Sequence, residues 1–112
     1  MPARRLRTQI VKGMTPMLAL AVIGEGELYG YEIAQRIREQ SGGTFVPSEG
    51  SLYPTLHRLE FDGVLQATWR DGEKGPRRRY YRLTKKGQGL LADAQADWAV
   101  IVRAVSGVTA GA

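Results

Sequence analysis

The 112-residue sequence contains no cysteine and a single histidine, His57. The lack of thiols excludes disulfides, thiolate zinc sites and cysteine nucleophiles, and it suits a reducing cytoplasm. One histidine without a second cluster of ligand-type residues argues against a metal site or a catalytic histidine. The glycine-rich residues 72–75 are not a phosphate loop, because the lysine and the following serine or threonine of such loops are missing. We therefore expect neither an enzyme nor a cofactor.

Long apolar segments are also absent. The apolar run at residues 17–23 has seven residues, whereas a membrane span needs about twenty. Basic residues precede this run, as in an export signal, but Glu25 and Glu27 follow it and no small-x-small cleavage site comes after it. The sequence predicts a cytoplasmic protein that does not associate with membranes.

Acidic residues are scarce in the two segments where basic residues gather. The chain carries a net charge of +5, and its 43% of hydrophobic residues is typical of a folded domain. Residues 1–12 contain four basic residues and no acid: Arg4, Arg5, Arg7 and Lys12. Residues 70–86 contain two acids, Asp71 and Glu73, against Arg70, Lys74, Arg77, Arg78, Arg79, Arg82, Lys85 and Lys86. Such patches favour a polyanionic partner.

Helical periodicity predicts two helices in the first forty residues. The first should cover much of residues 6–23, with a break or its true start at Thr15 and Pro16, because threonine followed by proline is a typical helix start. The second should run over about residues 29–40, with the glycines that follow it ending the helix.

A third helix should begin at the capping residue Ser48 and end at Gly63, where a left-handed C-terminal cap is expected. Its buried stripe, at the spacing i, i+4, i+7, is Leu52, Leu56 and Leu59. At 100° per residue the opposite side presents Gly50, Pro54, His57, Arg58 and Phe61, with Ser51 and Tyr53 on its shoulders. In a helix-turn-helix this side faces the DNA groove, and the alternative is a solvated polar face.

After the third helix the hydrophobic period changes from 3.6 to 2. Residues 65–70 and 77–83 are expected to be two antiparallel strands joined by a turn at residues 71–76. A helix followed by a basic hairpin is typical of a winged helix-turn-helix, whose hairpin, the wing, grips phosphates. The arginines of the hairpin tip are either phosphate contacts or a solubilising cluster. The predicted DNA-binding residues are Ser48, Gly50, Ser51, Tyr53, Pro54, His57, Arg58, Lys74, Arg77, Arg78 and Arg79.

Thr84 should cap a last helix from Lys85 to about Ser106, with fraying from Gly107 onward. Its apolar residues step by three and four, as in a heptad seam: Leu91, Ala94, Trp98, Ile101, Val105 and Val108. An amphipathic helix on its own core gives the same pattern. Because the other elements already supply a core, we favour a homodimer whose interface is Leu91, Ala94, Trp98, Ile101 and Val105.

The predicted fold is therefore mainly α with a small antiparallel β-hairpin. Residues 1–84 form a winged helix-turn-helix DNA-binding domain that includes the N-terminal helix, and residues 85–112 form a C-terminal dimerisation helix. The partner is double-stranded DNA. A different class of function remains open, in which the winged helix does not bind DNA and its arginines serve an acidic protein.

Three segments in this order resemble the PadR-type transcriptional regulators. They are residues 28–33 (LYGYEI), residues 50–63 (GSLYPTLHRLEFDG) and residues 77–87 (RRRYYRLTKKG). The short C-terminal helix is similar to the branch that includes multidrug-sensing repressors. Pro16 and Phe61 depart from the family pattern.

The resemblance implies a two-fold dimer that represses a palindromic promoter site. In multidrug-sensing members, a tryptophan eleven residues past the glycine that closes the wing lines a hydrophobic pore and stacks on flat aromatic compounds. Counting from Gly87, that position is Trp98. The implied ligand-binding residues are Trp98, Ala94 and Ile101, and binding of an aromatic ligand would relieve repression.

Overall fold

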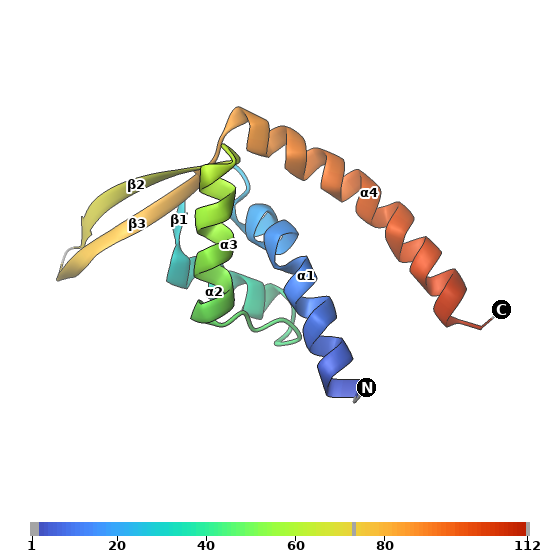
Figure 1. Ribbon diagram of the computed structural model, residues 1–112. Helices are drawn as coiled ribbons and strands as arrows, with labels where there is room; N and C mark the ends of the chain where they lie inside the picture. Colours follow the sequence, from blue (N-terminus) through green and yellow to red (C-terminus); the bar gives the residue numbers. More distant parts are fainter. Residues whose placement is uncertain (1–2, 73, 112) are drawn as a thin grey trace.

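A three-helix body carries a β-hairpin on one side and a long helix on the other (Figure 1). The computed structural model describes residues 3–72 and 74–111, and it measures 55 × 31 × 23 Å. Within this part of the chain the elements are α1 (Ala3–Ile23), β1 (Leu28–Tyr29), α2 (Gly30–Gln40), α3 (Glu49–Phe61), β2 (Leu65–Gly72), β3 (Gly75–Leu83) and α4 (Lys85–Thr109). This architecture confirms the predicted winged helix-turn-helix followed by a C-terminal helix. No described helix combines the length and apolarity needed to cross a bilayer.

The core lies where the three helices of the body meet the base of the sheet. Its members are Ala19, Leu20 and Ile23 of α1, Leu28, Ile33 and Ile37 around α2, Leu52 and Leu56 of α3, and Val64, Leu65, Tyr81 and Leu83 of the hairpin. Full burial of a leucine, isoleucine or valine side chain of this kind contributes about 1.5–3 kcal/mol. The predicted leucine stripe of α3 is confirmed, because Leu59 also packs against this cluster.

Helix α1 continues through Pro16, so the predicted break or start at Thr15 and Pro16 is wrong. Thr15 is buried, and its Oγ1 donates to the carbonyl of Val11 at 3.2 Å instead of capping a new helix. Proline removes one helical hydrogen bond. The buried residues of the following turns, such as Leu20, hold the segment against the body, so tertiary packing outweighs the local signal.

The predicted caps are confirmed. The Ser48 side chain accepts a hydrogen bond from the backbone of Ser51, and the Thr84 side chain accepts one from the backbone of Gly87. Gly63 follows α3 with φ of +78°, a left-handed conformation that favours glycine. Helix α2 begins with Tyr29 at its N-cap, within one residue of the prediction.

The sheet has the order β1-β3-β2 and is antiparallel throughout. Leu65 pairs with Leu83 and Trp69 with Arg79, so the predicted alternation is confirmed. The turn is shorter than expected, because the strands extend to Gly72 and from Gly75. The periodicity did not reveal β1, a two-residue strand whose Tyr29 pairs with Tyr80.

Helix α4 extends to Thr109, so the prediction that the helix frays from Gly107 is wrong for residues 107–109. Ala112 lies outside the described residues. Thr109 Oγ1 donates to the carbonyl of Val105 at 2.8 Å in the last turn. Only the first part of α4 meets the body, where Leu91 packs against the core and Gly87 is buried. Beyond it the helix leads away from the body (Figure 1).

Candidate nucleic-acid interface

Helix α3 presents an open face beside the wing. Gly50, Pro54, His57 and Arg58 are all exposed there, as the helical rotation predicts. At the start of the helix Ser48 and Ser51 share hydrogen bonds, since Ser51 Oγ donates to the carbonyl of Ser48 at 3.1 Å. The hydroxyl groups at this end of the helix therefore take part in a formed N-cap.

A groove of about 300 Å³ lies where β1, the start of α2, α3 and the wing meet. Its lining residues come from β1, α2, α3 and the hairpin: Tyr29, Gly30, Tyr31, Tyr53, Trp69, Arg77, Arg78, Arg79 and Tyr81. Gly30 leaves room for the ring of Tyr53, because a Cβ at this position would lie 2.5 Å from Tyr53 Cε1. Burial raises the pKa of the Tyr81 hydroxyl above its usual value, so this phenol stays neutral at physiological pH.

One face of the wing centres on Trp69. The guanidinium carbons of Arg77 and Arg79 both lie 5.6 Å from its ring centroid. Arg79 also contacts Glu60 of α3, with 2.5 Å between Arg79 Nη2 and Glu60 Oε2. Arg77 reaches Asp71 at 3.4 Å in an exposed pair, and exposed pairs of this kind add little stability.

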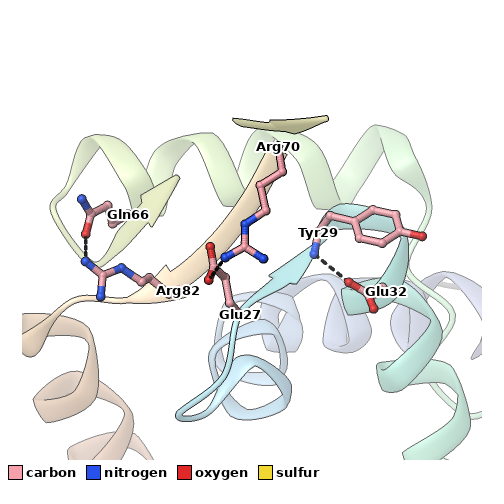
Figure 2. Close-up of polar contacts among 6 residues, drawn as sticks. All are labelled: Glu27, Tyr29, Glu32, Gln66, Arg70 and Arg82. Atoms are coloured by element: carbon pink, nitrogen blue, oxygen red, sulfur yellow. Dashed lines mark hydrogen bonds and ion pairs between the residues drawn. The ribbon is translucent and has the colours of Figure 1, made fainter. Parts of the chain in front are cut away.

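The other face carries Arg70 and Arg78 over two tyrosines. Arg78 lies 4.5 Å from the ring centroid of Tyr29, and Arg70 lies 4.6 Å from that of Tyr80. Figure 2 shows Arg70 also reaching Glu27, which precedes β1, at 2.5 Å. The same figure shows the Tyr29 backbone N–H donating to Glu32 Oε1, which ties the start of α2 to this face. Farther along the wing Arg82 donates to Gln66.

Helix α3 lies next to the wing, and α4 projects on the opposite side of the body (Figure 1). Lys74 is exposed in the turn of the hairpin, and Arg77 and Arg78 are exposed next to it. The fold therefore places an open helix face and a cationic ribbon next to each other. Among the described residues no group of three or more histidines, cysteines or acids is placed to hold a metal.

Residues 19–93 match the transcriptional regulator PadR-like family. The chain belongs to this family. Transcriptional regulator Rv3488 of Mycobacterium tuberculosis is 35% identical over 83 residues, which cover 74% of each chain. The structure of a PadR-like regulator from Bacillus cereus is similar with a TM-score of 0.75 and 33% identity, covering 90% of this chain and 96% of that one.

A second similar structure is PadR of Bacillus subtilis in complex with operator DNA. It has a TM-score of 0.64 and 26% identity, and the match covers 70% of this chain and 44% of that one. The PadR-like chain is accordingly a transcriptional regulator, and members of this family are regulators, not enzymes.

The residues predicted for dimerisation and ligand binding lie on α4, away from the wing. Leu91 and Ala94 are half-buried, whereas the exposed fraction is 39% for Trp98 and 47% for Ile101. Val105 is also exposed. From Trp98 onward the predicted seam thus presents apolar side chains that the described chain leaves exposed, whereas Leu91 packs against the core.

The periodicity of the sequence did not reveal the side chains that hold the wing arginines. The sequence patterns did not single out Glu60, and they gave Glu27 only as an acid after the apolar run. Their contacts depend on how the hairpin packs against the body, and no spacing in the sequence encodes that packing. Phe61, whose side chain is 90% exposed, does not fold back onto the helix end.

Proposed function

We propose that this PadR-like regulator binds double-stranded DNA through α3 and the wing. In this arrangement α3 enters the major groove and the hairpin lies along the adjacent phosphates. The single observation that carries the proposal is that exposed α3 residues and exposed wing cations stand on two elements that lie next to each other (Figure 1). The DNA complex of the similar Bacillus subtilis PadR supports it.

In this proposal the predicted contacts have distinct tasks. Lys74, Arg77 and Arg78 are exposed and contact DNA phosphates. Such contacts fix the position of the protein on the duplex but do not distinguish base sequences. His57 and Arg58 reach base edges from α3. Gly50 and Pro54 allow the helix to approach closely, while Ser48, Ser51 and Tyr53 offer groups to the backbone.

We also propose that residues 85–112 join two chains into a homodimer that represses a palindromic promoter site. Exposed apolar side chains along α4, such as Trp98 and Ile101, support pairing of two such helices. Two-fold symmetry of the protein would then match the two-fold symmetry of the operator.

The test of DNA binding is a salt series. Anisotropy of a labelled mixed-sequence duplex should show affinity that falls linearly in log K against log salt, with a slope of about 0.9 per phosphate contact. Sequencing of DNA selected by the pure protein should then yield a palindrome. A protein that shifts no duplex at low salt but captures acidic proteins would instead support the protein-interaction function.

The finer proposal is that a flat aromatic compound stacks between the Trp98 rings of the two subunits and relieves repression. Each stacked pair is worth about 0.5–1.5 kcal/mol beyond burial, so two rings give affinity without strict polar requirements. Ala94 and Ile101 lie on the same side of α4, at helical spacing from Trp98.

Tryptophan emission tests this ligand site. In a Trp69→Phe background, flat cationic and neutral aromatics should quench Trp98 and lower DNA affinity. With Trp98→Ala the same compounds should no longer lower DNA affinity, while the dimer persists. If no compound quenches Trp98, and Trp98→Ala only weakens the dimer, the residue packs the interface and senses nothing.

A further inference from the structure

Each face of the wing carries one arginine that turns back towards the body of the molecule. Arg79 reaches Glu60 in the last turn of α3, and Arg70 reaches Glu27 in the connection before β1. Trp69 pairs with Arg79 in the sheet, and the next residue, Arg70, pairs with Arg78. Because successive pairs point to opposite faces, the two carboxylates hold the ribbon from opposite sides.

The Arg79 side chain is packed inward. The exposed fractions of the Arg79 and Glu60 side chains are 33% and 29%, whereas that of Arg77 is 64%. The Arg79 guanidinium lies between Trp69 at 5.6 Å and Tyr81 at 6.0 Å. Its Nε is buried without a hydrogen-bond partner among the described residues. Such a group is already committed to the interior and is poorly placed to reach a phosphate.

Acidic residues beside a DNA-binding surface repel phosphates, so Glu60 and Glu27 are unfavourable there unless they serve another purpose. A two-stranded ribbon is marginally stable by itself and needs contacts to hold its direction. Partly buried ion pairs are also screened less by salt than exposed ones.

We propose that Glu60–Arg79 and Glu27–Arg70 form a wing clamp, which fixes the direction of the hairpin relative to α3. Glu60 and Glu27 are positioning residues. Their partners, the half-buried Arg79 and the exposed Arg70, act as struts that hold the ribbon. The exposed Arg77 and Arg78 are then held where phosphates meet them. This assignment rests on the proposed DNA binding, and it replaces the phosphate contact expected for Arg79.

The decisive variant is Glu60→Gln, because the two roles of Glu60 predict opposite signs. Loss of a negative charge alone strengthens DNA binding. Loss of the clamp weakens binding of a labelled mixed-sequence duplex by roughly threefold to tenfold, the size of one ordinary intramolecular hydrogen bond. Glu27→Gln should act in the same direction but less, since Arg70 is more exposed. Glu25→Gln is the matched control, because Glu25 lies exposed in the same connection without an ion pair among the described residues.

A second pair of variants separates struts from contacts. Arg79→Ala should lower affinity and leave the salt slope unchanged, whereas Arg77→Ala should lower the slope by about 0.9 per subunit. Exchange of the charges, Glu60→Arg with Arg79→Glu, should recover affinity relative to either single change.

A readout without DNA keeps the clamp testable if the proposed function fails. In a Trp98→Phe background, acrylamide quenching of Trp69 should increase with Glu60→Gln and not with Glu25→Gln. If the wild-type protein binds no duplex, only the proposed DNA binding is contradicted, and Trp69 quenching still tests the clamp. Tighter binding by Glu60→Gln, a reduced slope for Arg79→Ala, or unchanged Trp69 quenching would each overturn the clamp.

Discussion

The wing and α4 project from the same three-helix body, but their side chains are partnered in opposite ways. Wing arginines meet carboxylates or aromatic rings of the same chain, as Arg79 does with Glu60 and Arg78 with Tyr29. Along α4 the apolar side chains from Trp98 onward lie exposed.

The wing arginines are thus partnered within one chain, whereas the exposed apolar face of α4 supports the proposed homodimer. Exposed charge needs no partner in water, but a row of exposed apolar residues marks an interaction site. The expected effects of mutation therefore differ in kind between the two regions.

The largest effect is expected from Ile101→Asp in α4. A charge placed in the apolar seam would have no partner in a closed interface, at a cost on the order of several kcal/mol. Sedimentation should show monomer or unfolded chain. Ala96→Asp, on the opposite side of the helix, is the control and should remain dimeric. A stable Ile101→Asp dimer would mean that the seam faces water or its own core.

The next effect concerns the wing cations. Arg77→Ala with Arg78→Ala should weaken binding to all duplexes and reduce the salt slope by about two units per subunit, because each lost phosphate contact contributes about 0.9. Salt titration by anisotropy measures this. Arg103→Ala on α4 removes an exposed cation far from the wing and should leave the slope unchanged. An unaltered slope in the double variant would assign the cluster to solubility.

A smaller effect is expected where the wing joins α4. A Cβ at Gly87 would collide with the carbonyl oxygen of Val64, and overpacking of this kind typically costs about 1–3 kcal/mol. Gly89, two residues later, has open space around it, so Gly89→Ala should stabilise the helix by up to about 1 kcal/mol. Thermal unfolding at fixed protein concentration compares them. Equal shifts for the two variants would show that the junction is not tightly packed.

The smallest effect concerns the cap of α4. Thr84→Ala removes the hydroxyl that accepts from Gly87 and donates to the carbonyl of Gly63 at 2.6 Å, and loss of an N-cap costs about 1 kcal/mol. The melting temperature should fall by a few degrees, and Thr84→Ser should retain most of the stability. A serine variant as unstable as the alanine variant would point to the methyl group instead.

Local chemistry made much of this fold predictable. The leucine stripe of α3, the caps Ser48 and Thr84, and the alternation around Trp69 each depend on residues close in sequence. Gly63 was likewise predictable, because the residue after α3 has a positive φ that favours glycine.

The failures share a different cause. Thr15 and Pro16 carry a local start signal, but α1 passes through them because its later turns are buried in the body. Strand β1 is too short to show a period and exists because β3 offers an edge. The positions of Glu60 and Glu27 beside the wing likewise follow from packing between distant segments.

One carbonyl group joins the two projecting regions. Val64 O accepts the backbone N–H of Thr84 and its hydroxyl, each at 3.1 Å, and the bare Gly87 rests against it. The base of the hairpin and the start of α4 are therefore held together at one junction, the elbow. In a two-fold assembly joined through α4, a change in the crossing angle of the two α4 helices would be carried through this elbow into the distance between the two wings. If the proposed dimer binds a palindromic operator, whose half-sites repeat at about 34 Å per helical turn, a change of angle at the subunit boundary would change how well the two wings fit that spacing.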